Sequence, residues 1–197
     1  MNNLTNGNGW TVIQRRLPVG TPQDDYTGTW NRTWSDYKTG FGNLYGNFWL
    51  GLHSIRRILI SPGSINSSFD LYIGIETTHP TDKHRCAYYH NFEISPEEED
   101  FKLMIGAINT TRAGEICGTT EATNTIDSLS DHNNVKFSTF DHDKDGHATN
   151  IAETLGGGWW FKNFNKSNLN GENDGIVWDG ILVPINGVVM AIKQVET

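Results

Sequence analysis

The stretch Phe137-Ser-Thr-Phe-Asp-His-Asp-Lys-Asp-Gly-His-Ala-Thr149 places Asp141, Asp143 and Asp145 two residues apart. Carboxylates at alternating positions of a tight turn converge on one point, and Ca²⁺ takes oxygen ligands from carboxylates, backbone carbonyls and water. Gly146, directly after the last Asp, permits the sharp bend that such a turn needs. The spacing therefore predicts a calcium-binding loop, and the alternative is a solvated acidic turn.

The first half of this loop also matches an EF-hand, but the rest of the stretch does not. Position 12 counted from Asp141 is Ala152, where an EF-hand requires a bidentate Glu. The preceding residues, 135–140, lack the pattern of an amphipathic helix, and Gly156-Gly-Gly-Trp-Trp160 cannot continue one. We therefore expect a calcium loop that is not flanked by two helices.

Composition limits the class of protein. The chain has 197 residues, and its seven Trp, nine Phe and six Tyr supply enough apolar area for the core of one domain. The formal net charge is -8 and no run of Lys or Arg exceeds two residues, which argues against nucleic acid as a partner. No apolar run has the length of a membrane span, and the first residues lack a signal-peptide core. Either a signal has been removed or the chain is not exported.

Glycosylation sequons favour export, because the acceptor pattern matters only in a secretory pathway. The cysteine count leaves the redox compartment open: Cys86 and Cys117 are the only two, and they form either one disulfide or two buried thiols. The five sequons begin at Asn3, Asn31, Asn66, Asn109 and Asn165.

Hydrophobic periodicity predicts strands and two short helices. Residues 68–76 alternate apolar and polar side chains, which is typical of a half-buried strand. One helix is expected from Trp34 to Thr39, stopped by Gly40, and a second from about Asn47 through Ile58. The segment 130–187 is rich in Gly, Asn and Asp and is expected to be mostly loop. The other strand candidates are 10–14, 86–94, 101–105 and 188–195.

Several motifs together resemble the fibrinogen-related domain, the globular module of fibrinogen chains, ficolins, tachylectins, tenascins and angiopoietins. The resemblance implies an α+β fold in a single domain, 1–197, with a central, mainly antiparallel sheet and short flanking helices. Residues 9–129 and 188–197 would form the sheet subdomain, and 130–187 a loop-rich calcium- and ligand-binding subdomain. The motifs are Gly9–Arg16, Trp34–Leu44, Phe48–Gly51, Gly156–Phe161, Ser167–Gly171 and Gly175–Trp178.

The resemblance also implies the ligands of the metal. The side chains of Asp143 and Asp145 and the backbone carbonyls of His147 and Thr149 would bind Ca²⁺, with Asp141 adjacent to the ion and outside its ligand set. Two direct carboxylates imply a modest dissociation constant, on the order of 10⁻⁴ to 10⁻³ M. The expected role of the ion is to stabilise a segment that has little core of its own.

The ligand pocket implied by the resemblance consists of Asn163, Phe164 and Asn165 together with Trp160. The family has a disulfide where this chain has Ile151 and Phe164, and a cis peptide where it has Asn163–Phe164. A non-proline cis bond costs roughly 2.5 to 4 kcal/mol, so its retention without the disulfide is left open.

A second departure is a shortened loop between Gly171 and Gly175, where the family inserts an aromatic wall of the pocket. This chain has only Glu172-Asn173-Asp174, which predicts a shallow acidic rim.

The resemblance implies a secreted, non-enzymatic recognition domain with a lectin-like ability to bind acetylated or other glycans, in settings such as innate immunity or cell adhesion. The alternative is a protein-interaction module that binds a receptor or matrix partner and has no sugar pocket. A third interpretation, a calcium-dependent hydrolase using His142 or His147, lacks a nucleophile elbow or phosphate-binding loop. Oligomerisation in the family often uses segments outside this domain.

Overall fold

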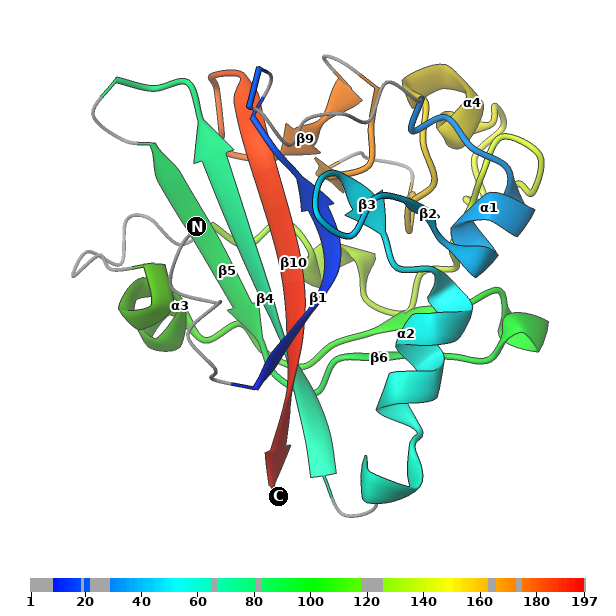
Figure 1. Ribbon diagram of the computed structural model, residues 1–197. Helices are drawn as coiled ribbons and strands as arrows, with labels where there is room; N and C mark the ends of the chain where they lie inside the picture. Colours follow the sequence, from blue (N-terminus) through cyan, green and yellow to red (C-terminus); the bar gives the residue numbers. More distant parts are fainter. Residues whose placement is uncertain are drawn as a thin grey trace.

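The computed structural model describes residues 9–18, 20–21, 29–64, 67–80, 83–117, 126–162, 166–172 and 175–196. A six-stranded sheet runs through the molecule in the order β2-β3-β1-β10-β4-β5, and every pairing in it is antiparallel (Figure 1). Its strands are β1 (Trp10–Arg16), β2 (Phe41–Gly42), β3 (Phe48–Trp49), β4 (Ser67–Thr77), β5 (His84–Tyr89) and β10 (Ile185–Glu196). The α+β class with a mainly antiparallel sheet is confirmed.

Two smaller ladders complete the strands. β6 (Glu93–Ile94) pairs with β7 (Leu103–Met104), and β8 (Ser167–Asn168) pairs with β9 (Val177–Trp178). The predicted strands 86–94 and 101–105 are thus shorter than expected. The backbone explains both breaks, because Asn91, Asp100 and Phe101 have positive φ angles of 51°, 60° and 45°, which interrupt an extended strand.

Strand β4 is buried on both faces, whereas its alternating pattern predicted burial on one. Leu71 and Ile73 face the main core, while Tyr72 belongs to a second cluster with Cys86 and Val189. An unpredicted helix, α3 (Thr110–Cys117), packs against β5 and contributes Ala113 to this second cluster. The second face of the sheet is therefore covered as well.

Helix α1 (Trp34–Thr39) has the predicted bounds. The Thr33 hydroxyl accepts a hydrogen bond from the Asp36 amide and the Asp36 carboxylate accepts one from Thr33 N, which forms a capping box. The helix ends at Gly40, whose φ is 98° and where a Cβ atom would lie 2.6 Å from the Leu50 carbonyl oxygen. Only glycine fits this close approach of two backbones.

The second helix begins later than predicted. Phe48 and Trp49 form β3, and α2 (Leu52–Leu59) starts only after Gly51, whose φ is 95°. The helical spacing of apolar residues across 48–58 was therefore misleading, since the first two belong to a strand that pairs with β1 and β2.

The segment 130–187 is mostly irregular, as predicted, but contains short regular elements that the sequence analysis did not foresee. These are the 3₁₀ turn η4 (Ser130–His132), helix α4 (Ile151–Leu155), β8 and β9. Elsewhere in the described part of the chain, η1 (Pro62–Ser64) and η2 (Glu97–Glu99) are also 3₁₀ turns.

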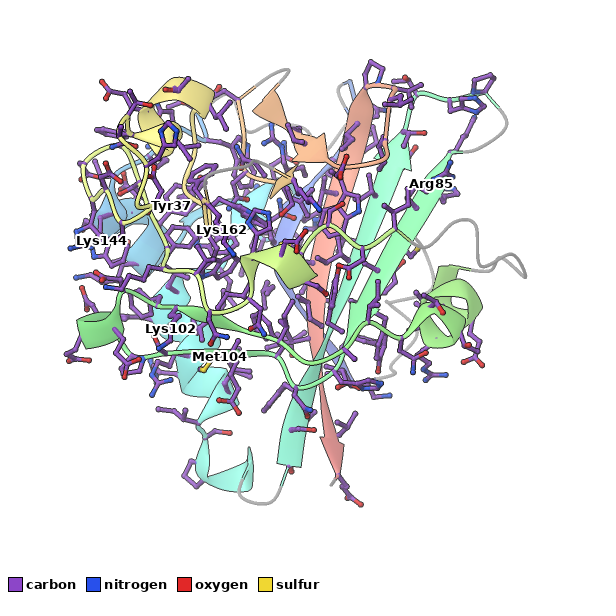
Figure 2. All side chains as sticks on the ribbon, turned by 180° about the vertical axis from the view of Figure 1, so that it is seen from behind. Tyr37, Arg85, Lys102, Met104, Lys144 and Lys162 are labelled. Atoms are coloured by element: carbon purple, nitrogen blue, oxygen red, sulfur yellow. The ribbon has the colours of Figure 1, made fainter. Side chains whose placement is uncertain are left out.

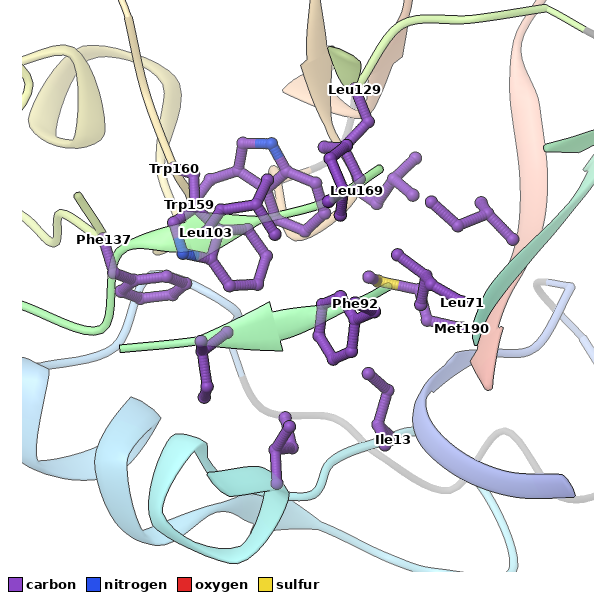
Figure 3. Packing of buried hydrophobic residues seen from close by; sticks show 14 of the residues in the cluster. Ile13, Leu71, Phe92, Leu103, Leu129, Phe137, Trp159, Trp160, Leu169 and Met190 are labelled. Atoms are coloured by element: carbon purple, nitrogen blue, oxygen red, sulfur yellow. The ribbon is translucent and has the colours of Figure 1, made fainter. Parts of the chain in front are cut away.

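The core is one continuous cluster that joins the sheet to the loop-rich segment. Figure 3 shows Phe137, Trp159 and Trp160 packed on one side of Leu103, with Phe92, Leu71 and Met190 toward the sheet. Phe137 and Trp160 meet edge to face, with ring centroids 5.2 Å apart. Both ends of the segment 137–160 are consequently buried in this core.

The structure also bears on the state of the cysteines and on membrane-spanning helices. Cys86 in β5 is disulfide-bonded, and the sequence holds one other cysteine, Cys117, at the end of α3. The choice between a disulfide and free thiols is thereby decided for the disulfide. None of the helices among the described residues has the length and apolar character of a membrane span.

Candidate functional site

The predicted calcium loop is anchored where it leaves the core. Ser138 and Trp159 form an isolated antiparallel bridge, with N···O distances of 2.9 and 3.1 Å. The Ser138 hydroxyl then accepts a hydrogen bond from Lys144 N at 2.9 Å, which folds the loop back toward its start. Figure 2 shows Lys144 at the outer edge of the loop-rich side, opposite Arg85 on β5. The loop is thus buried where it begins, at Ser138, and exposed at Lys144.

Asp145 is the fixed point of the loop. Its side chain is only 7% exposed, and its two carboxylate oxygens accept hydrogen bonds of 2.7 Å from His147 N and from Ile151 N. Each carboxylate oxygen has a second lone pair, so these bonds orient the group without exhausting its capacity to bind a cation. The carboxylate also links the loop to the first turn of α4.

Asp143 and Asp141 have different surroundings. Asp143 accepts one weak bond, from Asp145 N at 3.2 Å, and otherwise faces outward. Asp141 accepts hydrogen bonds from Trp34 N at 2.9 Å and from the Thr139 hydroxyl at 2.7 Å. Its carboxylate therefore stabilises the start of α1.

The donor set of the loop fits a hard cation. The carbonyl oxygens of His147 and Thr149 accept no backbone hydrogen bond in the described part of the chain. The imidazole Nδ1 of His147 lies 3.2 Å from both the backbone nitrogen and the carbonyl oxygen of Thr149. In the tautomer whose Nδ1 carries no proton, this nitrogen accepts from Thr149 N and the Thr149 carbonyl stays available. Two carboxylates and two such carbonyls are the oxygen ligands that Ca²⁺ prefers.

No three His, Cys, Asp or Glu side chains gather as a metal cluster among the described residues. An ion bound in this loop would accordingly depend on its backbone carbonyls as much as on its side chains. That dependence makes the conformation of the loop, fixed by Asp145 and Ser138, the main determinant of affinity.

His142 supports the loop from its other side. Its Nε2 lies 2.7 Å from an oxygen of Asp100, and its ring packs on Trp34 with centroids 4.0 Å apart. Both contacts hold the ring in place, and no Ser or Cys nucleophile accompanies it in these contacts. The arrangement gives no support to the hydrolase interpretation.

The structure gives Trp160 a role different from the one predicted. Its side chain is 0% exposed, and the indole N–H donates to the Phe101 carbonyl at 2.8 Å. The ring therefore supports the segment from within the core and presents no face to a ligand. The other three predicted pocket residues, Asn163, Phe164 and Asn165, lie outside the described residues, and so does the Asn163–Phe164 peptide.

His132 was missed by the sequence analysis. Its ring is 0% exposed, and Nδ1 lies 2.7 Å from the Trp160 carbonyl oxygen, so this nitrogen carries the proton and donates it. Burial lowers the pKa of His132, and the bond to Trp160 and the charge of Asp131 oppose this only in part. A buried neutral histidine thus fixes the backbone that leads into the predicted pocket.

Glu172 does not take its expected place in an exposed acidic rim. Its carboxylate accepts hydrogen bonds from the hydroxyl of Thr29 and from the amides of Trp30 and Asn31, the last at 2.9 Å. Burial raises the pKa of Glu172, but these donors outweigh it and the net shift is downward. This side chain ties the shortened loop to the segment before α1, whereas Asn173 and Asp174 lie outside the described residues.

Comparison with known proteins agrees with the fold. The family model of the C-terminal globular domain of fibrinogen beta and gamma chains matches residues 2–194. The chain belongs to this family, the fibrinogen-related domains.

Its relatives are longer proteins. Tenascin-R of Mus musculus is 38% identical over 180 residues, which cover 88% of this chain and 11% of that protein. Fibrinogen-like protein 1 of Bos taurus is 32% identical over 206 residues, which cover 96% of this chain and 61% of that protein. The chain therefore spans less than two thirds of these relatives.

Solved structures give the same fold. The fibrinogen-like globe domain of human ANGPTL2 is 30% identical with a TM-score of 0.74, covering 95% of this chain and 81% of that one. Lamprey fibrin D-dimer, solved with the peptide ligand Gly-His-Arg-Pro-amide, is 25% identical with a TM-score of 0.70, covering 95% of this chain and 62% of that one.

Proposed function

We propose that the chain is a non-enzymatic, extracellular recognition domain whose loop-rich segment is stabilised by Ca²⁺. The observation that carries the calcium proposal is that one loop holds the Asp143 and Asp145 carboxylates together with the carbonyls of His147 and Thr149, which accept no backbone hydrogen bond among the described residues. The extracellular location is supported by the disulfide at Cys86, because disulfides persist in oxidising compartments.

The chain's own residues would hold the ion in a fixed arrangement. When bound, Ca²⁺ supplies a positive charge that neutralises the two carboxylates and crosslinks the loop. Asp145 is already oriented by two backbone amides, so binding it requires little reorganisation. Asp143 is held by one weak bond and would be ordered by the ion, which makes Asp143 the better position for a test.

The calcium proposal is tested by isothermal titration of Ca²⁺ into chelator-treated protein. We expect a dissociation constant on the order of 10⁻⁴ to 10⁻³ M. Asp143→Asn should weaken binding at least tenfold, because it removes a ligand charge and disturbs only the bond to Asp145 N. Glu153→Gln is the matched control, since Glu153 is an exposed acid in the adjacent α4. Equal affinities for wild type and Asp143→Asn would refute the site.

For the ligand, we propose acetylated or other glycans bound by the loop-rich segment. The predicted residues Asn163, Phe164 and Asn165 follow Trp160, whose carbonyl is fixed by His132. A glycan array measured with Ca²⁺ and with chelator tests this proposal. Binding that is lost in chelator and in Asp143→Asn supports it, and the absence of binding to any glycan refutes it.

A protein or peptide ligand is the second candidate. The shortened loop favours it, because Glu172 turns away toward Thr29 and the aromatic wall expected of a sugar pocket is missing. The lamprey fibrin structure, which holds a peptide ligand, provides a precedent within the family. Titration of short peptides with a free amino terminus, alongside their N-acetylated counterparts as controls, separates this candidate from the glycan proposal.

A further inference from the structure

We propose that Asn31 carries an N-linked glycan in the folded, secreted protein and that Asn109 does not. The proposal rests on the extracellular location proposed above. It concerns the two sequons that the structure describes, Asn31-Arg-Thr33 and Asn109-Thr-Thr111. The other three acceptor residues, Asn3, Asn66 and Asn165, lie outside the described residues.

Asn31 offers a free acceptor on a rigid backbone. The residue is exposed, and its backbone N–H lies 2.9 Å from both the Thr29 hydroxyl and the Glu172 carboxylate. Its side-chain amide makes no hydrogen bond with any described residue. A sugar attached to Nδ2 would therefore extend into solvent and break no contact of the folded chain.

The modification has a defined chemistry. The Asn31 Nδ2 atom bonds to C1 of an oligosaccharide carried by a polyisoprenyl diphosphate. The C1–O bond to the diphosphate breaks, the lipid diphosphate leaves with the bonding electrons, and one Nδ2 proton is lost. No oxidant or reductant is involved.

Asn109 uses both ends of its side-chain amide within the fold. Its Oδ1 accepts a hydrogen bond of 2.9 Å from Arg112 N and thereby caps the first turn of α3. Its Nδ2 lies 3.2 Å from Nε2 of His90. The opposite nitrogen of the same ring, Nδ1, lies 3.1 Å from the buried carboxylate of Asp70. The side chain is therefore part of a hydrogen-bonded chain that reaches β4.

A glycan at Asn109 is incompatible with these contacts. The amide of an N-linked glycan is planar and trans, as in a peptide bond, so the sugar carbon lies on the same side of the C–N bond as Oδ1. At Asn109 that side faces Arg112 N at the start of α3. The sugar would have to displace the first turn of the helix, which packs against β5 and contains Cys117.

Folding would therefore select between the two sites. Oligosaccharide transfer acts on the chain before it folds, so both sequons are accessible to it at that stage. A chain modified at Asn31 can reach the folded state unchanged, whereas a chain modified at Asn109 cannot form the cap and the contact with His90. Figure 1 shows α1, which follows Asn31, and α3, which follows Asn109, on opposite sides of the molecule, so the two sites act independently.

The test is site-resolved mass spectrometry of the full chain, given a signal sequence and secreted from eukaryotic cells. Enzymatic deglycosylation in ¹⁸O water converts each glycosylated Asn into ¹⁸O-labelled Asp. We expect the label at position 31 in most molecules and unmodified Asn at position 109. Unlabelled Asn at position 31, or label at position 109 in folded protein, would overturn the proposal.

Two variants provide a second readout that does not depend on glycosylation. In protein made without glycans, Asn31→Gln should leave the thermal midpoint unchanged and Asn109→Gln should lower it, because only Asn109 has contacts to lose. The opposite ranking would contradict the structural argument. The calcium titration of deglycosylated protein is independent of this result, so failure of the glycan map and failure of the proposed function are distinguishable.

Discussion

The buried ring of His132 predicts that the domain loses stability in mild acid. The ring is 0% exposed, donates from Nδ1 to the Trp160 carbonyl, and has no partner at Nε2 among the described residues. Protonation would place a positive charge and an N–H without an acceptor inside the core. The unfolded chain, in contrast, binds this proton freely.

The sign and size of the effect follow from linkage. Burial lowers the pKa of His132 below its ordinary value of 6.5, so below pH 6.5 the unfolded state binds more protons than the folded state. The stabilisation from a neutral ring is fully present above pH 6.5 and is lost as the pH falls toward the folded-state pKa. The limiting slope is about 1.4 kcal/mol per pH unit, so lowering the pH from 7.5 to 5.5 should cost at most about 1.4 kcal/mol through His132.

Urea unfolding at pH 7.5, 6.5 and 5.5 measures this slope, with chelator present throughout so that calcium binding does not contribute. With a slope near 3 kcal/mol per molar urea, the midpoint should shift downward by up to about 0.5 M. His132→Gln keeps a donor for the Trp160 carbonyl but cannot titrate, so its stability should depend less on pH by that amount. His84→Gln is the control, because His84 is exposed. Parallel pH profiles for wild type and His132→Gln would refute the reasoning.

Three further changes have expected outcomes. Glu172→Gln should lower the free energy of unfolding by about 1 to 2 kcal/mol, since a charged acceptor of three hydrogen bonds is lost and the group is partly exposed. Because the pKa of Glu172 is lowered, this stabilisation should be present above the pKa of the unfolded state and be lost as the pH falls through the pKa of the folded state. Urea unfolding of wild type and Glu172→Gln at pH 6 and pH 3.5 measures this loss. Cys86→Ser should lower the free energy of unfolding by on the order of 3 to 4 kcal/mol, because the disulfide then no longer restricts the unfolded chain. An unchanged melting temperature would contradict this expectation. Gly157→Ala should cost about 2 to 3 kcal/mol in chemical unfolding, because φ is 93° and a Cβ would overlap the Asn170 carbonyl oxygen.

Local signals in the sequence were sufficient where one element determines its own structure. Helix α1 was predicted with its observed bounds, because Thr33 and Asp36 cap it and Gly40 ends it. β1, β4 and β10 were also predicted as strands, each somewhat shorter than observed. The spacing of the carboxylates predicts a calcium loop from local sequence alone, and this calcium site stays a prediction.

The errors arose where distant segments decide the outcome. Phe48 and Trp49 fit a helical pattern but pair with β1 and β2, and nothing within their own segment indicates those partners. Glu172 was expected to face solvent. Its carboxylate instead accepts hydrogen bonds from donors more than 140 residues earlier, the Thr29 hydroxyl and the Asn31 amide. His132 and the second covered face of β4 were missed for the same reason.

The position of β10 in the sheet bears on how the chain folds during synthesis. This strand lies between β1 and β4 and pairs with both, although it is translated after every other strand of the sheet. Until it leaves the ribosome, β1 and β4 lack their common neighbour and their edges stay unpaired. Such long-range pairing is slow and leaves apolar strands open to aggregation in the meantime. The nascent domain should therefore depend on chaperones until β10 has emerged, and it should acquire its central sheet only then.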